Sequence, residues 1–209
     1  MNLELTQAIT SRRSIRKLKP RKIPRNIIHS ILDLARWAPS AHNAQPWRLI
    51  VIENDKVKAK LAMEMGKVWL SDMEKDGVTR NEAKERVKLK TWNRITNSPI
   101  VIIVCLDKND VRKILDSRRQ KSEYLMAVQS VAAYIQTLLL VASAYELGAC
   151  WLCTPLFCQS AVGKVLRLPK TFEPQAMIII GLPDEKPPPP RRKPLDEFCR
   201  LDRWTRHRS

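Results

Sequence analysis

Four short runs of mainly apolar residues predict the strands of a β-sheet. They occupy residues 47–53, 100–106, 150–153 and 176–180. The second run, Ile-Val-Ile-Ile-Val-Cys-Leu, is apolar throughout, which is expected of a central strand covered on both faces. The run at 47–53 is also interpreted as a buried strand.

Apolar residues at helical spacing predict helices around and between these strands. The segments are 3–10, 24–37, 55–65 continuing through 69–74, 79–96, 122–147 and 157–166. Thr79 and Glu82 have the spacing of a capping box, which predicts a helix start. The helix at 122–147 is apolar nearly all round, so we expect a core helix that could also form a subunit contact. Gly148 is expected to end it as a C-terminal cap.

The order of these elements, with strands separated by long helices, predicts a sheet sandwiched by helices, in an α/β or α+β domain. The 209 residues suffice for one well-buried domain. There are five glycines and no Gly-x-Gly-x-x-Gly or Walker-type sequence, so a Rossmann or P-loop interpretation has no support. The longest apolar segment, 131–145, is shorter than a membrane span. We therefore expect a soluble, cytoplasmic protein.

The net charge of +17 predicts attraction to anions such as phosphates, carboxylate-rich ligands or nucleic acid. A basic nucleic-acid-binding module without catalysis is therefore an alternative interpretation. No helix-turn-helix, zinc-finger or stacking-aromatic signature favours it, so a nucleic-acid partner is not expected.

The five cysteines give no disulfide framework. Cys150 and Cys153 form a Cys-x-x-Cys sequence, but side chains three residues apart on a strand point to opposite faces. Only Cys158 lies near enough in sequence to be a further ligand. We expect small, buried cysteines and no metal site.

Two polar segments carry the candidate chemistry. Residues 11–16, Ser-Arg-Arg-Ser-Ile-Arg, offer a group of guanidinium and hydroxyl donors suited to a phosphate dianion. Residues 38–47, Ala-Pro-Ser-Ala-His-Asn-Ala-Gln-Pro-Trp, form a polar loop closed by two prolines. Its side chains could bond a ribityl chain or the edge of a flavin. Either segment alone could be ordinary solvated surface.

With Arg192-Lys193-Pro194-Leu195-Asp196-Glu197 near the C-terminus, these segments resemble the FMN-dependent nitroreductase family in order and spacing. Within it, residues 69–77, 148–151 and 166–169 resemble the reductase half of the bifunctional deazaflavin-coenzyme ligase/reductase. The resemblance implies an α+β, nitroreductase-like fold with a mainly antiparallel central sheet. It also implies a homodimer with FMN at the interface, and hydride transfer from a donor such as NAD(P)H to a conjugated or nitro-type acceptor, with a deazaflavin as one candidate.

The resemblance also assigns residues by their motif positions. The FMN phosphate and ribityl oxygens would be held by Arg12, Arg13, Ser14 and Arg16. Arg192 would be a second phosphate-binding cation, and Arg191 would be an imperfect substitute for a lysine that the family has near this position. Ser40 and Asn43 would reach the flavin from the same or the partner chain. Thr154, Pro155 and Leu156 would face the flavin ring with backbone N–H groups, although Pro155 has none. Asp72 and His42 are candidate substrate contacts. No catalytic side chain is expected, because the flavin carries the reactive atom.

The C-terminal part begins with four prolines at 187–190, which must be extended and cannot pair in a sheet. We therefore divide the chain into an FMN-binding domain at 1–190 and a basic extension at 191–209 that packs on the dimer.

Overall fold

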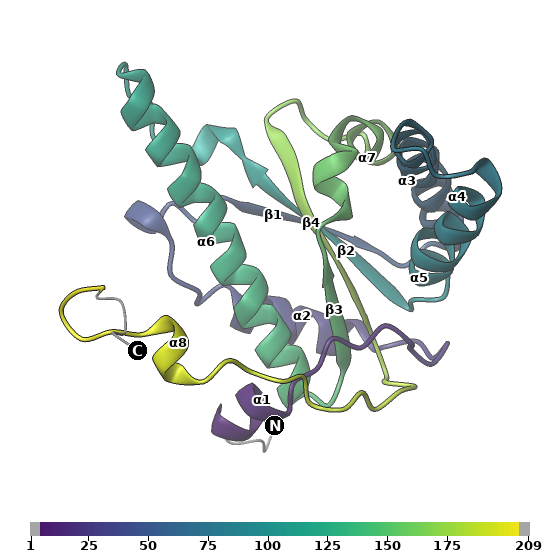
Figure 1. The fold of residues 1–209 in the computed structure, drawn as a ribbon, viewed down its shortest axis with the longest axis horizontal. Helices are drawn as coiled ribbons and strands as arrows, with labels where there is room; N and C mark the ends of the chain where they lie inside the picture. The colour runs from purple at the N-terminus through teal and green to yellow at the C-terminus, as the bar shows by residue number, and fades with distance from the viewer. Residues whose placement is uncertain (1–4, 205–209) are drawn as a thin grey trace, which may run out of the picture.

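The computed structural model describes residues 5–204, which contain one four-stranded antiparallel sheet in the order β1-β2-β4-β3 (Figure 1). The strands are β1 (Trp47–Ile52), β2 (Ile100–Asp107), β3 (Gly148–Leu152) and β4 (Phe172–Gly181). The α+β prediction and all four strands are confirmed. β4 begins earlier than predicted, because a bulge in β2 between Val104 and Cys105 lets the pairing continue past Pro174.

The central strand β2 is buried at every position. Ile102 and Val104 face one core, whereas Val101 and Ile103 face the other, as expected of a strand whose side chains alternate. β1 differs, because it lies at the edge of the sheet and Val51 is exposed. The prediction of a buried strand is therefore wrong at Val51, near the end of β1.

Helices cover both faces of the sheet (Figure 1). α2 (Arg25–Ala35) and α6 (Ser117–Ala144) lie on one face, and α3 (Asp55–Lys75) and α7 (Gln159–Leu166) lie on the other. The short helices are α1 (Leu5–Ser11), α4 (Arg80–Val87), α5 (Asn93–Thr96) and α8 (Leu195–Phe198). A π-helical turn spans Lys88–Trp92, and 3-10 turns span Ala41–Asn43, Lys108–Asp110 and Thr154–Phe157.

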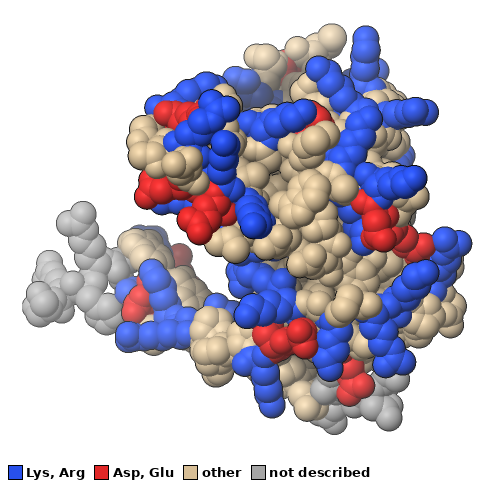
Figure 2. All heavy atoms as spheres, turned by 90° about the vertical axis from the view of Figure 1, so that its right-hand side faces the viewer, with Lys and Arg blue, Asp and Glu red and all other residues tan. Residues whose placement is uncertain are grey.

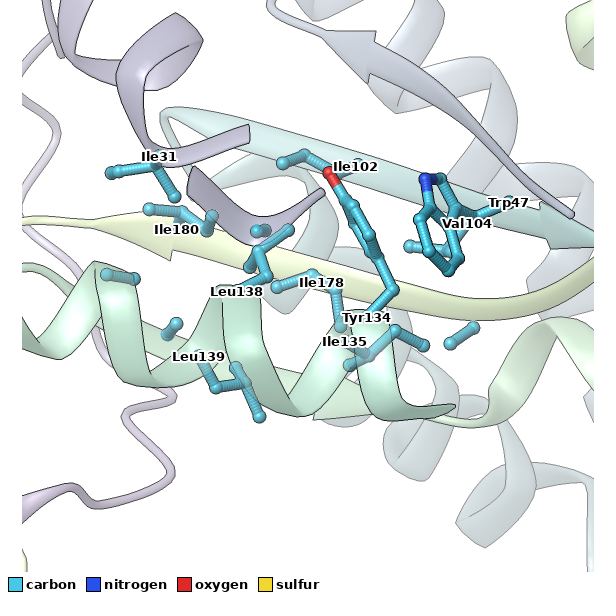
Figure 3. Close-up of a cluster of buried hydrophobic side chains, with 14 of the residues drawn as sticks. Ile31, Trp47, Ile102, Val104, Tyr134, Ile135, Leu138, Leu139, Ile178 and Ile180 are labelled. Atoms are coloured by element: carbon cyan, nitrogen blue, oxygen red, sulfur yellow. The ribbon is translucent and has the colours of Figure 1, made fainter. Parts of the chain in front are cut away.

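The core between α6 and the sheet is built around two aromatic rings (Figure 3). The centroids of Trp47 on β1 and Tyr134 on α6 lie 4.9 Å apart. The Tyr134 hydroxyl is satisfied, since it donates to the carbonyl of Leu32 on α2 at 3.3 Å. These contacts fix α6 and α2 against the sheet and so set the frame for the polar segments.

The predicted helix at 79–96 is interrupted. Thr79 caps it as expected, because its hydroxyl accepts from the Glu82 backbone N–H. The segment then passes from α4 through the π-helical turn into α5. The predicted first helix is confirmed as α1 from Leu5; residues 3 and 4 lie outside the described residues.

α6 is longer than predicted at its start. It begins at Ser117, because the Asp116 carboxylate accepts from the Arg119 backbone N–H at 2.8 Å and caps the helix. At its other end Glu146 takes the left-handed conformation, with φ of 59°. Gly148 is instead the first residue of β3, so the prediction that it caps α6 is wrong.

Among residues 5–204, α6 alone is long and apolar enough to cross a membrane by length and composition. Its most apolar window is 44% buried inside the fold. The helix packs against the sheet along one side, as a core helix does.

Gly148 is required where the N-terminal segment crosses the sheet edge. A Cβ there would lie 2.8 Å from Ile15 Cγ2 and 2.9 Å from Ile15 Cβ. We expect Gly148→Ala to lower the free energy of unfolding by about 1–3 kcal/mol, the usual cost of overpacking. Gly163→Ala on α7 is the control, because nothing lies within 4 Å of its Cβ position. Urea unfolding of both variants is the measurement, and equal midpoints would contradict the steric role.

The C-terminal extension runs away from the body of the chain (Figure 1). Residues 187–194 form no regular element, as predicted from the four prolines, and α8 is a single short turn. Large apolar side chains on the extension are exposed, namely Leu195, Phe198, Leu201 and Trp204. The last five residues of the predicted extension lie outside the described residues.

Candidate functional site

The arginine segment is held against the outer edge of β3. The Ile15 backbone N–H donates to the Ala149 carbonyl at 3.0 Å, and Ser14 forms a parallel bridge with Ala149. The Ile15 side chain is buried in the core below α3 and α7. An apolar anchor thus fixes the backbone between two arginines, which limits where their side chains can reach.

A second anchor comes from Glu185, just after β4. Its Oε1 accepts from the backbone N–H groups of Arg16 at 2.5 Å and of Lys17 at 3.1 Å. Desolvation opposes the charged form, but these two bonds and the charges of Lys17 and Arg16 outweigh it and lower the pKa of Glu185. The contribution to stability is therefore present above the ordinary carboxyl pKa, and is lost as the pH falls through the lower folded value.

Arg12 and Arg13 line a hollow of about 560 Å³ between β3, the end of α6 and residues 183–187. Arg13 is engaged there, because its Nη1 donates to the carbonyls of Thr10 and Arg12, both at 2.8 Å. Arg12 is half-buried, and within residues 5–204 its guanidinium has no hydrogen-bonding or carboxylate partner. A desolvated cation without a partner favours an anionic ligand.

A neighbouring hollow of about 550 Å³ begins at Arg16 and Lys17. Its other wall is formed by Leu89, Asn93 and Arg94, from the π-helical turn and α5. Asp184 and Glu185 line both hollows. The sequence did not predict Asn93 and Arg94 as site residues, because the π-helical turn before them shows only in the structure. Such turns are frequent at functional sites.

The end of β3 and the segment after it contain unsatisfied polar atoms. Within the described part of the chain, Thr154 Oγ1 and Trp151 Nε1 are buried and have no hydrogen-bond partner. The Leu156 N–H is already used, because it donates to the Cys153 carbonyl at 3.0 Å in the 3-10 turn. The predicted backbone donors are therefore reduced to Thr154, whose hydroxyl adds a group that sequence reasoning did not consider.

The polar loop at 38–47 is strained and tied down. His42, Asn43 and Gln45 have positive φ values of 56°, 52° and 48°, which are uncommon outside glycine. Ser40 Oγ accepts from the Gln45 N–H at 3.0 Å. The Ala41 N–H donates to Ser130 Oγ on α6, also at 3.0 Å. The loop is thus pre-organised, with Asn43 exposed.

His42, predicted as a substrate contact, also makes an internal contact. Its Nε2 lies 3.1 Å from Oε2 of Glu123, a buried carboxylate on α6. The half-exposed imidazole therefore anchors the loop.

We expect Glu123→Gln to lower the free energy of unfolding by about 1 kcal/mol, because it weakens a hydrogen bond to a charged group. Glu85→Gln is the matched control, since Glu85 is exposed and has no ion-pair partner among residues 5–204. Chemical unfolding at neutral pH measures both. A loss of the same size in the control would show that the His42 contact contributes nothing.

Within one chain, the two polar segments lie at opposite ends of α6. The loop contacts Glu123 and Ser130, whereas the hollow beside Arg12 is lined by Leu139 and Ser143. From Ser130 to Ser143 the helix advances by roughly 20 Å at 1.5 Å per residue. The structure does not bring Ser40 and Asn43 together with Arg12 in a single chain.

Three other predicted residues lie apart from these groups. Arg191 and Arg192 are exposed on the extended segment before α8. Asp72 lies on α3, where its Oδ1 is 3.4 Å from the Lys75 Nζ. The structure places Asp72 close enough to Cys158 for its charge to affect the thiol.

The cysteines are only partly as expected. Cys150 and Cys158 are buried, but Cys153 follows β3 and is exposed, so its predicted burial is wrong. Burial raises the pKa of Cys150, and raises that of Cys158 to about 11, with a smaller effect of Asp72. These two thiols are therefore protonated at neutral pH. Among residues 5–204 no group of three His, Cys, Asp or Glu side chains could hold a metal ion.

Comparison with known proteins places this chain in a family. The sequence matches the Nitroreductase family over residues 9–182. It is 28% identical over 187 residues to a candidate NADH dehydrogenase/NAD(P)H nitroreductase of Methanothermobacter thermautotrophicus, covering 88% of this chain and 80% of that protein. It is 26% identical over 200 residues to an iodotyrosine dehalogenase 1 homolog of Caenorhabditis elegans, covering 91% of this chain but only 58% of that protein.

A solved structure shares the fold. A candidate nitroreductase from Desulfovibrio desulfuricans, solved in complex with FMN, superposes with a TM-score of 0.73 and 23% identity. The match covers 98% of this chain and 100% of that one.

Proposed function

The chain belongs to the nitroreductase family and is a flavin-dependent oxidoreductase, and we propose that it passes a hydride from NAD(P)H, through FMN, to a small conjugated or nitro-type acceptor. The relatives named above support the donor and the reaction class. Only the net charge favoured the alternative of a non-catalytic nucleic-acid-binding module. Membership of an oxidoreductase family does not support that alternative.

One observation carries the assignment of the phosphate end of the site. Arg12 is half-buried beside a hollow and has no anionic partner among the described residues. A phosphate monoester carries between one and two negative charges at neutral pH and accepts several hydrogen bonds. Trp151 Nε1 on β3 and Thr154 Oγ1 just after it are further unsatisfied polar atoms among the described residues, although neither residue lines the two hollows. The residues present therefore fit FMN.

Each group has a role that follows from its position. Arg12 and Ser14 would hold the phosphate. Arg192 lies after the four prolines, and it would reach the phosphate only if the extension folds back toward the site. Arg16 and Asn93, which share the second hollow, would bond the polar edge of the ring system. FMN supplies the atom that accepts and donates the hydride. The protein binds and orients it and needs no nucleophile of its own.

We propose a homodimer, because the outward side of α6 is uncharged and exposed and is therefore suited to a subunit contact. Residues 124–145 contain no charged residue, although 28% of the chain is charged. Outward positions carry Leu125, Gln129, Ala132 and Gln136, which are exposed or half-exposed. We propose that a two-fold axis across α6 brings the Ser40 loop of one protomer beside Arg12 of the other. The loop and the arginine segment, which lie apart in a single chain, would then form one site.

The exposed apolar side chains of the extension support the same assembly. Leu195 and Trp204 are largely exposed in the single chain, which is costly unless another surface covers them. We propose that residues 191–209 pack on the partner subunit, and that 1–190 form the FMN-binding domain.

A deazaflavin remains one acceptor of the proposed class, supported by the resemblance of residues 69–77, including Asp72, to deazaflavin reductases. The cytoplasm is the proposed location, where NAD(P)H is available.

The test is the cofactor and its reduction. The purified protein should be yellow and should release FMN on denaturation, and anaerobic NADH or NADPH should bleach its absorbance. Adding a nitroarene, a quinone or a deazaflavin should restore the colour. A protein that neither contains nor takes up FMN would contradict the proposal.

A further inference from the structure

The helices next to the second hollow differ in how their charges are arranged. On α3 three of the five lysines form ion pairs within a turn: Lys58–Asp55 at 2.8 Å, Lys67–Glu64 at 2.7 Å and Lys75–Asp72 at 3.4 Å. Residues 84–94, from α4 to α5, contain five cations and a single acid, Glu85. None of those five forms an ion pair with any residue in the range 5–204.

Three of these cations form what we call the cationic stripe: Arg86, Lys90 and Arg94. They recur at a spacing of four, which places consecutive side chains along one side of the helical segment. Like charges at this spacing repel each other and destabilise the helix that carries them. None of the three forms an ion pair among residues 5–204, so the chain keeps this row of cations at a cost in local stability.

The stripe borders the second hollow. Arg94 lines it directly, and Leu89, Asn93 and Asn97 on the adjoining row form its wall. Lys17 lies across the opening. Two acids, Asp184 and Glu185, also line the hollow. The carboxylate of Glu185 is already bonded to two backbone N–H groups. Figure 2 shows this side of the molecule, with Lys and Arg outnumbering Asp and Glu around a central depression.

We propose that the cationic stripe binds a substrate that carries at least two oxyanions, such as carboxylates or phosphates, and directs its reactive part into the second hollow. This inference rests on the proposed function. A hollow of about 550 Å³ fits a group of small-molecule size. The anion could belong to the electron donor or to the acceptor, and a net charge of +17 would steer either one toward the site.

The experiment compares charged and neutral substrates on a variant in which two cations of the stripe are replaced by neutral side chains. The donors are NADPH and the neutral 1-benzyl-1,4-dihydronicotinamide. The acceptors are 5-nitroisophthalate, a dianion, and the neutral 5-nitroisophthalamide. Arg86→Gln/Lys90→Gln is compared with Lys164→Gln/Lys170→Gln, which removes the same net charge at exposed positions on α7 and the turn after it.

We expect the stripe variant to lower kcat/KM roughly fivefold or more for an anionic substrate, as loss of two exposed charge contacts implies, and the control variant to do so much less. A loss confined to NADPH assigns the anion to the donor, and a loss confined to 5-nitroisophthalate assigns it to the acceptor. An equal loss with neutral substrates, or no loss with either anion, would overturn the inference.

A binding arm needs no turnover and separates this inference from the proposed function. Tripolyphosphate is titrated calorimetrically into the wild-type protein and both variants. The inference predicts weaker binding to Arg86→Gln/Lys90→Gln than to the control variant, and equal affinities would contradict it. Absence of flavin reduction in the wild-type protein would count against the proposed function alone.

Discussion

Replacing Arg12 by Ala is expected to raise the Kd for FMN roughly 10- to 150-fold, because it removes charge-assisted hydrogen bonds contributing about 1.5–3 kcal/mol. The guanidinium is half-buried and unpaired among residues 5–204, so the variant breaks no visible internal contact. Titration of apoprotein with FMN, followed by quenching of flavin fluorescence, measures the change.

Arg21→Ala is the matched control for this variant. Arg21 belongs to the same basic segment, is exposed, and lines neither of the two hollows. Its replacement should leave the FMN affinity unchanged. Equal losses in both variants would mean that general charge, and not a defined phosphate contact, governs binding.

Ala132→Glu should convert the proposed dimer into a monomer and abolish FMN binding at micromolar concentrations. The residue is half-exposed in the middle of the uncharged side of α6, so pairing would bury an unpaired carboxylate, which costs several kcal/mol. Light scattering after size-exclusion chromatography gives the mass, and absorbance gives the flavin content. Asn81→Glu, on exposed α4, should remain a flavin-loaded dimer.

The sequence pattern was sufficient for the elements with the clearest periodicity. β2 was predictable because its residues are apolar throughout, and the start of α4 because Thr79 and Glu82 have capping-box spacing. The role of Gly148 could not be predicted from its neighbours in the sequence. Its position after a long helix suggests a cap, but the reason for glycine there is the approach of Ile15, a contact distant in sequence.

The candidate site was predictable in part. The motifs identified Arg12 and the loop around Asn43, yet they could not show that the two lie at opposite ends of α6 in one chain. The engagement of His42 with Glu123 depends on a packing contact between residues far apart in sequence. Asn93 was missed because no motif marks it, and only the fold places it beside Arg16.

A mixed dimer tests most directly whether FMN binds a site built from two protomers. Arg12→Ala and Asn43→Asp chains are unfolded together, refolded as a mixture and titrated with FMN. If Arg12 of one chain meets Asn43 of its partner, half of the dimers are mixed and each contains one intact site, so roughly a quarter of all sites should bind with wild-type affinity. If one chain supplies both residues, no mixed dimer contains an intact site, and no high-affinity binding would return.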